Sequence, residues 1–339
     1  MENITIATDK LIALTNNKDN SGLYTITHAK DSTLQIGTNE DITEYRYRGA
    51  NPKNYVTFNG ETWRIIGVFP TDDGTGKMEN RVKIIKGQSI GNKSWDNGTT
   101  AYNYTKNDNL MLLQDKNKLK VEYLEKTNKY DVMLTAPEFC DGVNNWARPS
   151  TLNTYLNGTY LNSLSTDAKN MISNAKYYLG GYNGFVSGQG YTQTSVQMYL
   201  YERKTSGTDY YYGTNPNSWV GRLGLMYVSD YGYASDNCET KALNDYNNSN
   251  DLRICNNINW LYGVINSGNS LGVWTITEHI ASDAFKGRSV FYYIGGSFSF
   301  MQVCGTGSSI NIYPTLYLTS AAKITGGSGT SIDPYTLGL

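Results

Sequence analysis

The 339-residue sequence has little charge and few histidines, prolines and cysteines. Only 17% of its residues are charged, against roughly 25% in a typical soluble domain. The 29 Lys+Arg nearly balance the 30 Asp+Glu, so the chain lacks the electric field that attracts a nucleic-acid backbone. Two histidines cannot supply a three-histidine metal site. No apolar run reaches the roughly 18 residues that a membrane-spanning helix needs.

Tyrosine, glycine, asparagine and serine provide the polarity instead, with 29 Tyr and 34 Gly. An aromatic content of 13% argues against disorder. Surfaces rich in Tyr, Ser, Gly and Asn bind partners adaptably, because tyrosine offers rigid contact area and the small polar residues offer hydrogen bonds. The composition therefore fits a binding protein, and it also fits an ordinary β-rich secreted protein.

Four cysteines are present, and their spacing does not favour a zinc site because no C-x-x-C pair occurs. Cys238 and Cys255 flank a polar, Asn-rich stretch, and we predict a disulfide between them. Such a bond implies an oxidising, extracellular setting, whereas four free thiols are the alternative. Cys140 and Cys304 are left unassigned.

The first half of the sequence predicts strands around a tight turn. Asn59-Gly60 is the dipeptide typical of a two-residue hairpin, and alternating or continuous apolar residues flank it. Residues 91–131 are polar and irregular, which predicts an inserted loop, with one helix over 110–124. The other expected elements are a helix within 1–17, short strands within 22–50 (including 33–36), and strands at 55–58, 62–69 and 81–85.

The second half predicts two helices followed by a loop-rich region with short strands. Leucines at helical spacing indicate a helix after Ser150, and a second helix is expected from Thr166 to the Gly180-Gly181 pair. Strands at both ends of the chain, with helices and a long insertion between them, predict an α+β fold whose loops gather on one side. The expected strands are 195–201, 224–228, 272–277, 289–294, 298–303, 314–319, 323–325 and 335–337.

Several segments between about residues 50 and 339 carry a family resemblance. They are 55–69, 94–96, 146–156, 177–181, 224–234, 259–262, 273–277, 314–318 and 323–337. Their sequences resemble the C-type lectin fold in the version shared by formylglycine-generating enzymes and the variable proteins of diversity-generating retroelements. They also resemble lectin-like, pilin-anchored surface proteins of gut Firmicutes.

The resemblance implies an α+β, C-type lectin-like fold with terminal antiparallel strands, two helices and a long loop-rich insertion. Residues 1–50 would be an N-terminal helix and short strands, the remnant of an anchor or stalk, and 51–339 the ligand-binding domain. It implies a non-enzymatic adhesin or receptor on the bacterial cell surface, binding a protein or glycan, with no nucleic acid and no cofactor, and with a membrane or pilus anchor upstream. A structural pilus-like subunit and a formylglycine-generating-type enzyme are the alternatives.

In the variable proteins, ligand contacts lie just before the final strands, which corresponds to residues 278–313 here. This stretch departs from the surface-protein pattern, because Glu278 stands where a proline is expected and the arginine before Pro314 is absent. The resemblance therefore implies a diversified binding surface. Its predicted ligand contacts are Glu278, His279, Ile280, Asp283, Phe285, Tyr292, Ile294, Ser297, Ser299, Met301, Ile310, Ile312 and Tyr313.

No catalytic or metal-binding constellation is predicted. Two G-x-S-x-G matches occur, at 87–91 and 268–272, but neither leads into a helix, as a nucleophile elbow requires. Cys304 has no neighbouring cysteine, which argues against formylglycine-generating activity. Most of the six tryptophans are expected in the core, Trp63, Trp260 and Trp274 among them, whereas Trp219 is the best candidate for an exposed ring that could stack on a sugar.

Overall fold

A computed structural model provides the structure of the chain. It describes residues 5–15, 22–36, 39–95, 146–147, 150–182, 193–205, 216–247, 254–266, 272–279, 289–294, 297–301 and 309–339. Only the backbone is described for residue 182 and for 279, 289–294 and 297–301, and likewise for two short strands at 110–111 and 122–123. These residues form a mixed α+β structure, as the sequence predicts, with more sheet than helix.

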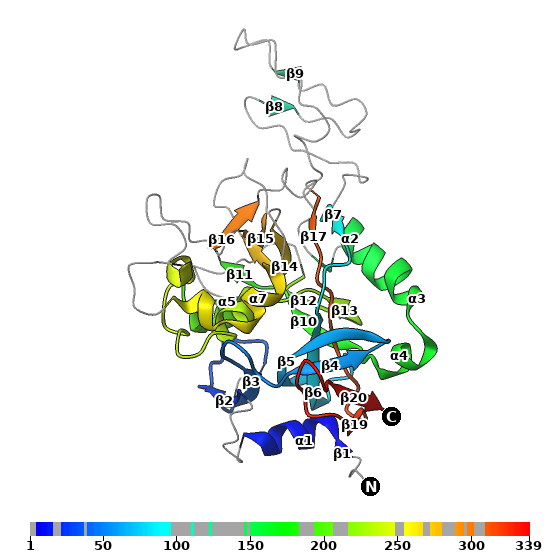
Figure 1. Cartoon of the computed structure of the whole chain (residues 1–339). Helices are drawn as coiled ribbons and strands as arrows, with labels where there is room; N and C mark the ends of the chain where they lie inside the picture. The colour runs from blue at the N-terminus through cyan, green and yellow to red at the C-terminus, as the bar shows by residue number, and fades with distance from the viewer. Residues whose placement is uncertain are drawn as a thin grey trace.

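The largest sheet contains ten strands within the described residues, and it brings the two ends of the chain together (Figure 1). Strand β1 (Thr5–Ile6) pairs antiparallel with β19 near the C-terminus. Strand β3 (Ile42–Tyr47) joins the sheet through β5, and β2 (Leu23–His28) pairs with β3. The main strand order is β1, β19 (Lys323–Gly326), β20 (Tyr335–Gly338), β4 (Tyr55–Phe58), β5 (Glu61–Asp72), β6 (Met78–Lys86), β18 (Thr315–Tyr317) and β13 (Leu223–Gly224). Residues 1–50 thus supply three strands to the same sheet as the rest of the chain.

The predicted hairpin at Asn59-Gly60 is confirmed. Both residues have positive φ, 53° for Asn59 and 73° for Gly60, which is the backbone shape of a type I′ turn. This turn matches the twist of the flanking strands, so β4 and β5 pair directly from Phe58 and Glu61 onward. Trp63 on β5 is fully buried, as the sequence predicts.

Helix α1 (Ala7–Leu14) covers one end of the sheet, with Leu11 completely buried. The helical region after Ser150 is confirmed, because the Ser150 hydroxyl caps it by accepting from the Asn153 N–H at 3.1 Å. Asn157 does not break this region. It lies in a π-helical segment, where its side chain pairs with both backbone groups of Leu223 on β13. The elements are α2 (Thr151–Thr154), the π-helical segment (Tyr155–Tyr160), α3 (Leu161–Ser163) and α4 (Thr166–Met171).

Other expected elements are wrong or shorter than predicted. Residues 195–201 lie in helix α5 (Ser195–Arg203), not in a strand. Helix α4 ends at Met171, and Ala175–Tyr178 forms strand β10, which pairs with β12 (Ser218–Gly221). The expected strand at 33–36 is absent from the described residues there. The expected helix over 110–124 is wrong where β8 (Leu110–Met111) pairs with β9 (Glu122–Tyr123).

A second sheet of six strands, counted over the described residues, lies beyond the helices α5 and α7 (Trp260–Ile265) in Figure 1. Its centre is β14 (Val273–His279). Each other described strand of the sheet pairs with β14 or with a strand that pairs with β14. The sheet also contains β15 (Ser289–Ile294), β16 (Ser297–Met301), β17 (Ile310–Asn311), β7 (Asn92–Lys93) and β11 (Gly181–Tyr182).

Aromatic rings connect the second sheet to the rest of the core. Trp274 on β14 packs edge-on against Trp95, which in turn contacts Trp146. Trp260 and Trp274 are buried, as predicted. Trp219 is half-buried rather than exposed, because its ring lies 5.6 Å from that of Tyr177 and 6.1 Å from that of Trp146.

The predicted Cys238–Cys255 disulfide is confirmed, with the two Cα atoms 6.2 Å apart. It joins the segment after helix α6 (Val228–Tyr233) to the turn before α7. Both cysteines are buried. The bond therefore holds together the loop-rich layer that carries the second sheet.

Candidate functional site

The predicted contact region coincides with the β14–β15–β16 ladder. In its register, Tyr292 lies opposite Ser299, Ile294 opposite Ser297, and Val290 opposite Met301. Directly paired residues belong to the same face of an antiparallel sheet, and residues two apart along a strand share a face. Five predicted contact positions thus fall on one face: Tyr292, Ile294, Ser297, Ser299 and Met301. We call these five positions the ladder face.

The opposite face of the ladder belongs to the side covered by helices α5 and α6. Thr277 on β14 donates from its hydroxyl to Glu202 of α5 at 2.7 Å and accepts from the Val228 N–H of α6 at 3.0 Å. Glu278, the residue after Thr277, has the other parity and pairs with Val290, which shares a face with Tyr292 and Ile294. The ladder face is consequently the one turned away from these two helices.

Four predicted contact residues are corrected by the structure, because their side chains lie in the interior. Glu278, Ile310, Ile312 and Tyr313 are each at most 2% exposed. Glu278 lies on the central strand β14, opposite Gly181 of β11, and strand β17 carries Ile310 between β14 and β7. Glu278 and Ile310 lie on strands with neighbours on both sides, and Ile312 and Tyr313 follow β17 outside any strand, so alternation alone could not reveal these positions.

The remaining predicted contacts are only partly described. His279 ends β14, and its backbone pairs with Ser289 of β15. Ile280, Asp283 and Phe285 lie outside the described residues. Five of the predicted contact positions thus share one face of the ladder, and four others are buried.

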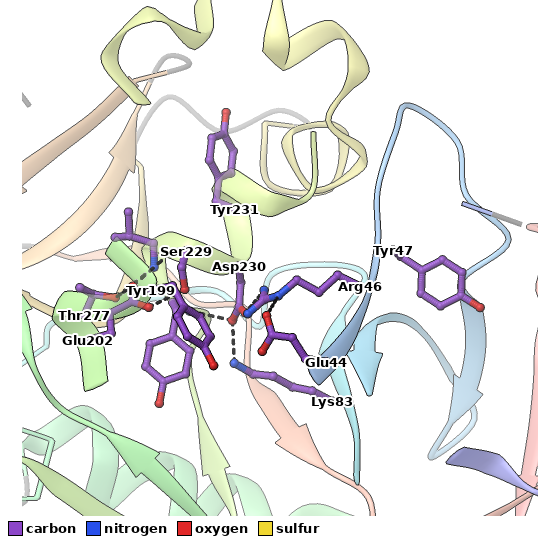
Figure 2. A network of polar contacts seen from close by, with 12 residues as sticks. Glu44, Arg46, Tyr47, Lys83, Tyr199, Glu202, Ser229, Asp230, Tyr231 and Thr277 are labelled. Carbon is purple, nitrogen blue, oxygen red and sulfur yellow. Dashed lines mark hydrogen bonds and ion pairs between the residues drawn. The ribbon is translucent and has the colours of Figure 1, made fainter. Parts of the chain in front are cut away.

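Beneath the second sheet lies a network of buried charges, drawn in Figure 2. Asp230, in the first turn of α6, accepts from Arg46 Nη1 at 2.9 Å and from Lys83 Nζ at 2.6 Å. Its carboxylate also accepts from the Tyr227 N–H at 2.9 Å, which caps the helix. Arg46 continues the chain of contacts to Glu44, and Glu44 lies 3.0 Å from Nε2 of His28. The network thereby links strands β2, β3 and β6 of the main sheet to α6.

A third buried carboxylate, Glu202 of α5, extends this connection to β14 of the ladder. It accepts hydrogen bonds from the N–H and the hydroxyl of Ser229 and from the hydroxyl of Thr277, as Figure 2 shows. Arg203 provides its nearest positive charge, at 3.2 Å. Strand β14, at the centre of the second sheet, is thus fixed to α5 and α6 through buried groups.

Burial and neighbouring charge act in opposite directions on these carboxyl groups. Burial favours the neutral form of Glu44, but the Arg46 guanidinium and the His28 hydrogen bond outweigh it and lower the pKa of Glu44 to about 2. Burial is likewise outweighed at Asp230, where Lys83 and Arg46 lower the pKa. At Glu202 burial prevails over Arg203 and the three hydrogen bonds, so its pKa is raised. This arrangement fits a structural network that fixes the layers of the fold.

A cleft of about 710 Å³ opens beside strand β2. Its walls come from β2 and the loop that follows it, from α5, and from the neighbourhood of α6. The lining residues are Thr25, Ile26, Thr27, His28, Ala29, Lys30, Asp31, Ser32, Arg48, Val196, Leu200, Tyr233 and Glu239. None of these residues was predicted as a contact. The sequence signal that could have indicated them is the Thr-Ile-Thr run of a strand with polar residues on both sides of Ile26.

The first G-x-S-x-G match connects strand β6 to strand β7 rather than a strand to a helix. The hydroxyl of Ser89 donates within this turn, to the Gly91 carbonyl at 3.2 Å or to Asn311 Oδ1 at 3.3 Å. This geometry is that of a turn-stabilising serine and differs from a nucleophile elbow. The second match falls almost entirely outside the described residues.

Within the part of the chain that the structure describes, no group of three or more His, Cys, Asp or Glu side chains is arranged to hold a metal ion. No helix among the same residues is long and apolar enough to cross a membrane. Compared with known proteins, the chain matches no family model, no curated protein and no solved structure.

Proposed function

We propose that this chain is a non-enzymatic ligand-binding protein of the C-type lectin-like class, which contacts a protein or glycan through the ladder face. The observation that carries the proposal is the register that puts Tyr292, Ile294, Ser297, Ser299 and Met301 on one face of β15 and β16, on the side away from α5 and α6. A mixture of tyrosine, aliphatic and serine side chains provides rigid contact area with adaptable hydrogen bonding.

The architecture supports this proposal in two ways. The terminal strands pair within one sheet, and the predicted contact segment belongs to a separate sheet at the loop-rich end of the molecule (Figure 1). The charge network beneath that sheet anchors β14, so the ladder is built on a rigid base, as a binding surface requires. A disulfide between Cys238 and Cys255 agrees with an extracellular location, because such bonds persist in oxidising compartments.

The test compares the two faces of the ladder. A Tyr292→Ala/Met301→Ala variant alters the ladder face, and a Phe291→Ala/Phe300→Ala variant alters the opposite face at the same strands. Each protein is applied to a printed glycan array and to a display library of bacterial surface proteins, with Tm measured in parallel. We expect the first variant to lose the ligands of the wild type with Tm within a few degrees, because side chains that contact a ligand contribute little to the core.

The second variant is expected to lower Tm, because its face belongs to the side of α5 and α6. Binding that survives the Tyr292→Ala/Met301→Ala change would contradict the proposal. A wild-type protein that binds neither collection and assembles in a concentration-dependent manner would instead identify a structural subunit.

We further propose that the segment 278–313 is diversified within the source population. Sequencing of this region of the gene from many cells tests the idea. Substitutions concentrated in the codons of the ladder face, with those of buried Ile310 and Ile312 constant, are the expected result. A uniform sequence across the population would indicate one fixed specificity.

A further inference from the structure

Strand β2 forms an edge of the main sheet. Within the described residues β3 is the strand that pairs with it, through a register from Leu23 opposite Tyr47 to His28 opposite Ile42. Immediately before this ladder, the Arg48 N–H donates to the Gly22 carbonyl at 2.7 Å, which makes these two residues a hydrogen-bonded pair.

This pair fixes the direction of the backbone groups along β2. In an antiparallel ladder, hydrogen-bonded and non-hydrogen-bonded pairs alternate. Residues 24, 26 and 28 therefore direct their N–H and C=O groups toward β3, whereas Thr25 and Thr27 direct theirs away from it. The outer edge of β2 thus presents two donor–acceptor sets, two residues apart.

The 710 Å³ cleft lies along this outer edge. It is lined by four consecutive residues of β2, from Thr25 to His28. Because consecutive side chains of a strand point to opposite faces, a cavity that touches all four runs beside the strand and not over one face. Thr25 and Thr27 are both exposed and line the cleft.

The opposite wall of the cleft is apolar and helical. Val196 and Leu200 lie one turn apart on α5, each half-buried, and so share a face of that helix. The charges that line the cleft balance, since Lys30 and Arg48 are matched by Asp31 and Glu239, and Arg48 is ion-paired with Glu239. The cleft therefore favours an occupant with little net charge, an apolar side chain and hydrogen-bonding groups at strand spacing.

We propose that this groove binds an extended, uncharged peptide segment as an additional strand beside β2. The main chain of the peptide would exchange hydrogen bonds with Thr25 and Thr27, and one apolar side chain would enter between Val196 and Leu200. Strand addition obtains affinity from main-chain hydrogen bonds and specificity from pockets for alternate side chains, and both elements are present here. Four residues of β2 span roughly 13 Å at about 3.4 Å per residue, enough for a short peptide motif. This site is separate from the ladder face and does not depend on it.

The probe is a displayed library of random heptapeptides, panned against the wild-type protein, with selected peptides synthesised for fluorescence polarisation. Thr27→Pro removes the outward N–H, which an edge strand tolerates because that group does not serve the ladder. Thr27→Val keeps the N–H and is the matched control. Leu200→Glu places a charge on the apolar wall without altering β2.

We expect selected peptides to be neutral and to carry an apolar residue. Their Kd should rise about tenfold or more with Thr27→Pro and with Leu200→Glu, and should change by less than about twofold with Thr27→Val. Amide hydrogen exchange at Thr25 and Thr27 should slow when peptide is added. Thr27→Pro should retain the wild-type Tm within a few degrees.

Four outcomes would overturn the proposal. In the first, the library yields no binding peptide. In the second, the Kd of the selected peptides is unchanged by both Thr27→Pro and Leu200→Glu. Thr27→Pro unfolds the protein, which would mean that this N–H faces β3. Sedimentation shows a dimer that Thr27→Pro abolishes, which would assign the edge to a second copy of the chain.

Discussion

Nζ of Lys83 lies 2.6 Å from Oδ2 of Asp230, and this buried ion pair joins strand β6 of the main sheet to the first turn of helix α6. The same carboxylate holds Arg46 of β3 at 2.9 Å (Figure 2). One carboxylate from the helical layer thus contacts two cations from the sheet, of which Arg46 is also paired with Glu44. Removing a single partner from such a network leaves a charge without compensation in a region from which water is excluded.

We therefore predict that Asp230→Asn lowers the free energy of unfolding by about 3–5 kcal/mol, because the buried Lys83 ammonium loses the carboxylate that pairs with it. Urea denaturation measures the change. Asp167→Asn is the matched control, because Asp167 also lies in the first turn of a helix, α4, but is exposed. Its expected effect is within about 0.5 kcal/mol. Equal effects of the two substitutions would show that the network does not stabilise the fold.

The lowered pKa of Glu44 predicts a loss of stability in acid. Its ordinary pKa is 4.5, and in the fold it is about 2 because the Arg46 guanidinium and the His28 hydrogen bond outweigh burial. A group with a depressed folded pKa contributes its stability fully above the unfolded pKa and loses it as pH falls toward the folded value. Thermal unfolding measured across the window between pH 4.5 and 2 should show Tm decreasing.

Glu44→Gln provides the control for this pH dependence. It should lower Tm at neutral pH, since the charge that pairs with Arg46 is lost, and it should flatten the decrease of Tm in acid. If the variant shows the same acid dependence as the wild type, the effect arises from other carboxyl groups. Glu202 contributes with the opposite sign, because its pKa is raised in the fold. Its contribution to stability is present at low pH and is lost as pH rises through the pKa of the folded state.

The disulfide predicts sensitivity to reductant. Cys238 and Cys255 are 17 residues apart, and a loop of about that length stabilises the folded state by about 3 kcal/mol in the chain-entropy model. Unfolding of the wild type in urea should shift to lower concentration when dithiothreitol is present. A Cys238→Ser/Cys255→Ser variant should unfold at the lower urea concentration of the reduced wild type, and dithiothreitol should not shift its midpoint further. A wild-type midpoint that dithiothreitol leaves unchanged would contradict the bond.

The parts of the fold that the sequence predicts correctly are those set by neighbouring residues. Asn59-Gly60 specifies its turn through two positive φ angles, and the strands on each side follow from apolar residues in short runs. The Ser150 cap and the leucines after it similarly define a helix start. Each of these signals is contained within a few residues, so one sequence suffices to detect it.

Helix α5 shows where such local reasoning fails. Thr194 caps it together with Gln197, a weak signal that the Tyr-rich pattern of 195–201 concealed. The helix is held by the burial of Glu202, whose partners Ser229 and Thr277 come from α6 and β14. Contacts between residues this distant in sequence leave no local pattern, and so neither the charge network nor the cleft beside β2 could be predicted.

The ladder face was predicted from the sequence only in part. The sequence pattern predicted the strands β15 and β16, whereas the position of Tyr292 opposite Ser299 comes from the register of the structure. It could not show that Glu278 is buried on the central strand β14, nor that Ile312 is buried just after β17, because contacts with distant parts of the chain bury both.

The glycine pair expected to end a helix has another role, which yields a last prediction. Gly181 on β11 pairs with Glu278 of β14, and a Cβ atom at position 181 would lie 1.9 Å from the Glu278 carbonyl oxygen. The oxygen is a backbone atom and a Cβ is held rigidly by its own backbone, so the clash can be relieved only by moving β11 away from β14. We predict that Gly181→Ala lowers stability by about 1–3 kcal/mol or more, as overpacking does. It should also weaken ligand binding through the ladder face, because a shift of β14 displaces its partner strand β15.

Gly263→Ala in helix α7 is the control for this change. Among the described residues, apart from its chain neighbours and the backbone of its own helix, no atom lies within 4 Å of the position that its Cβ would occupy. Alanine favours a helix over glycine by roughly 0.8–1.0 kcal/mol. The same chemical substitution should thus destabilise the protein at one glycine and stabilise it at the other, as measured by urea denaturation. Effects of the same sign at both positions would contradict the close approach of β11 to β14. Loss of ligand binding in Gly263→Ala would show that the binding defect of Gly181→Ala is not specific to the ladder.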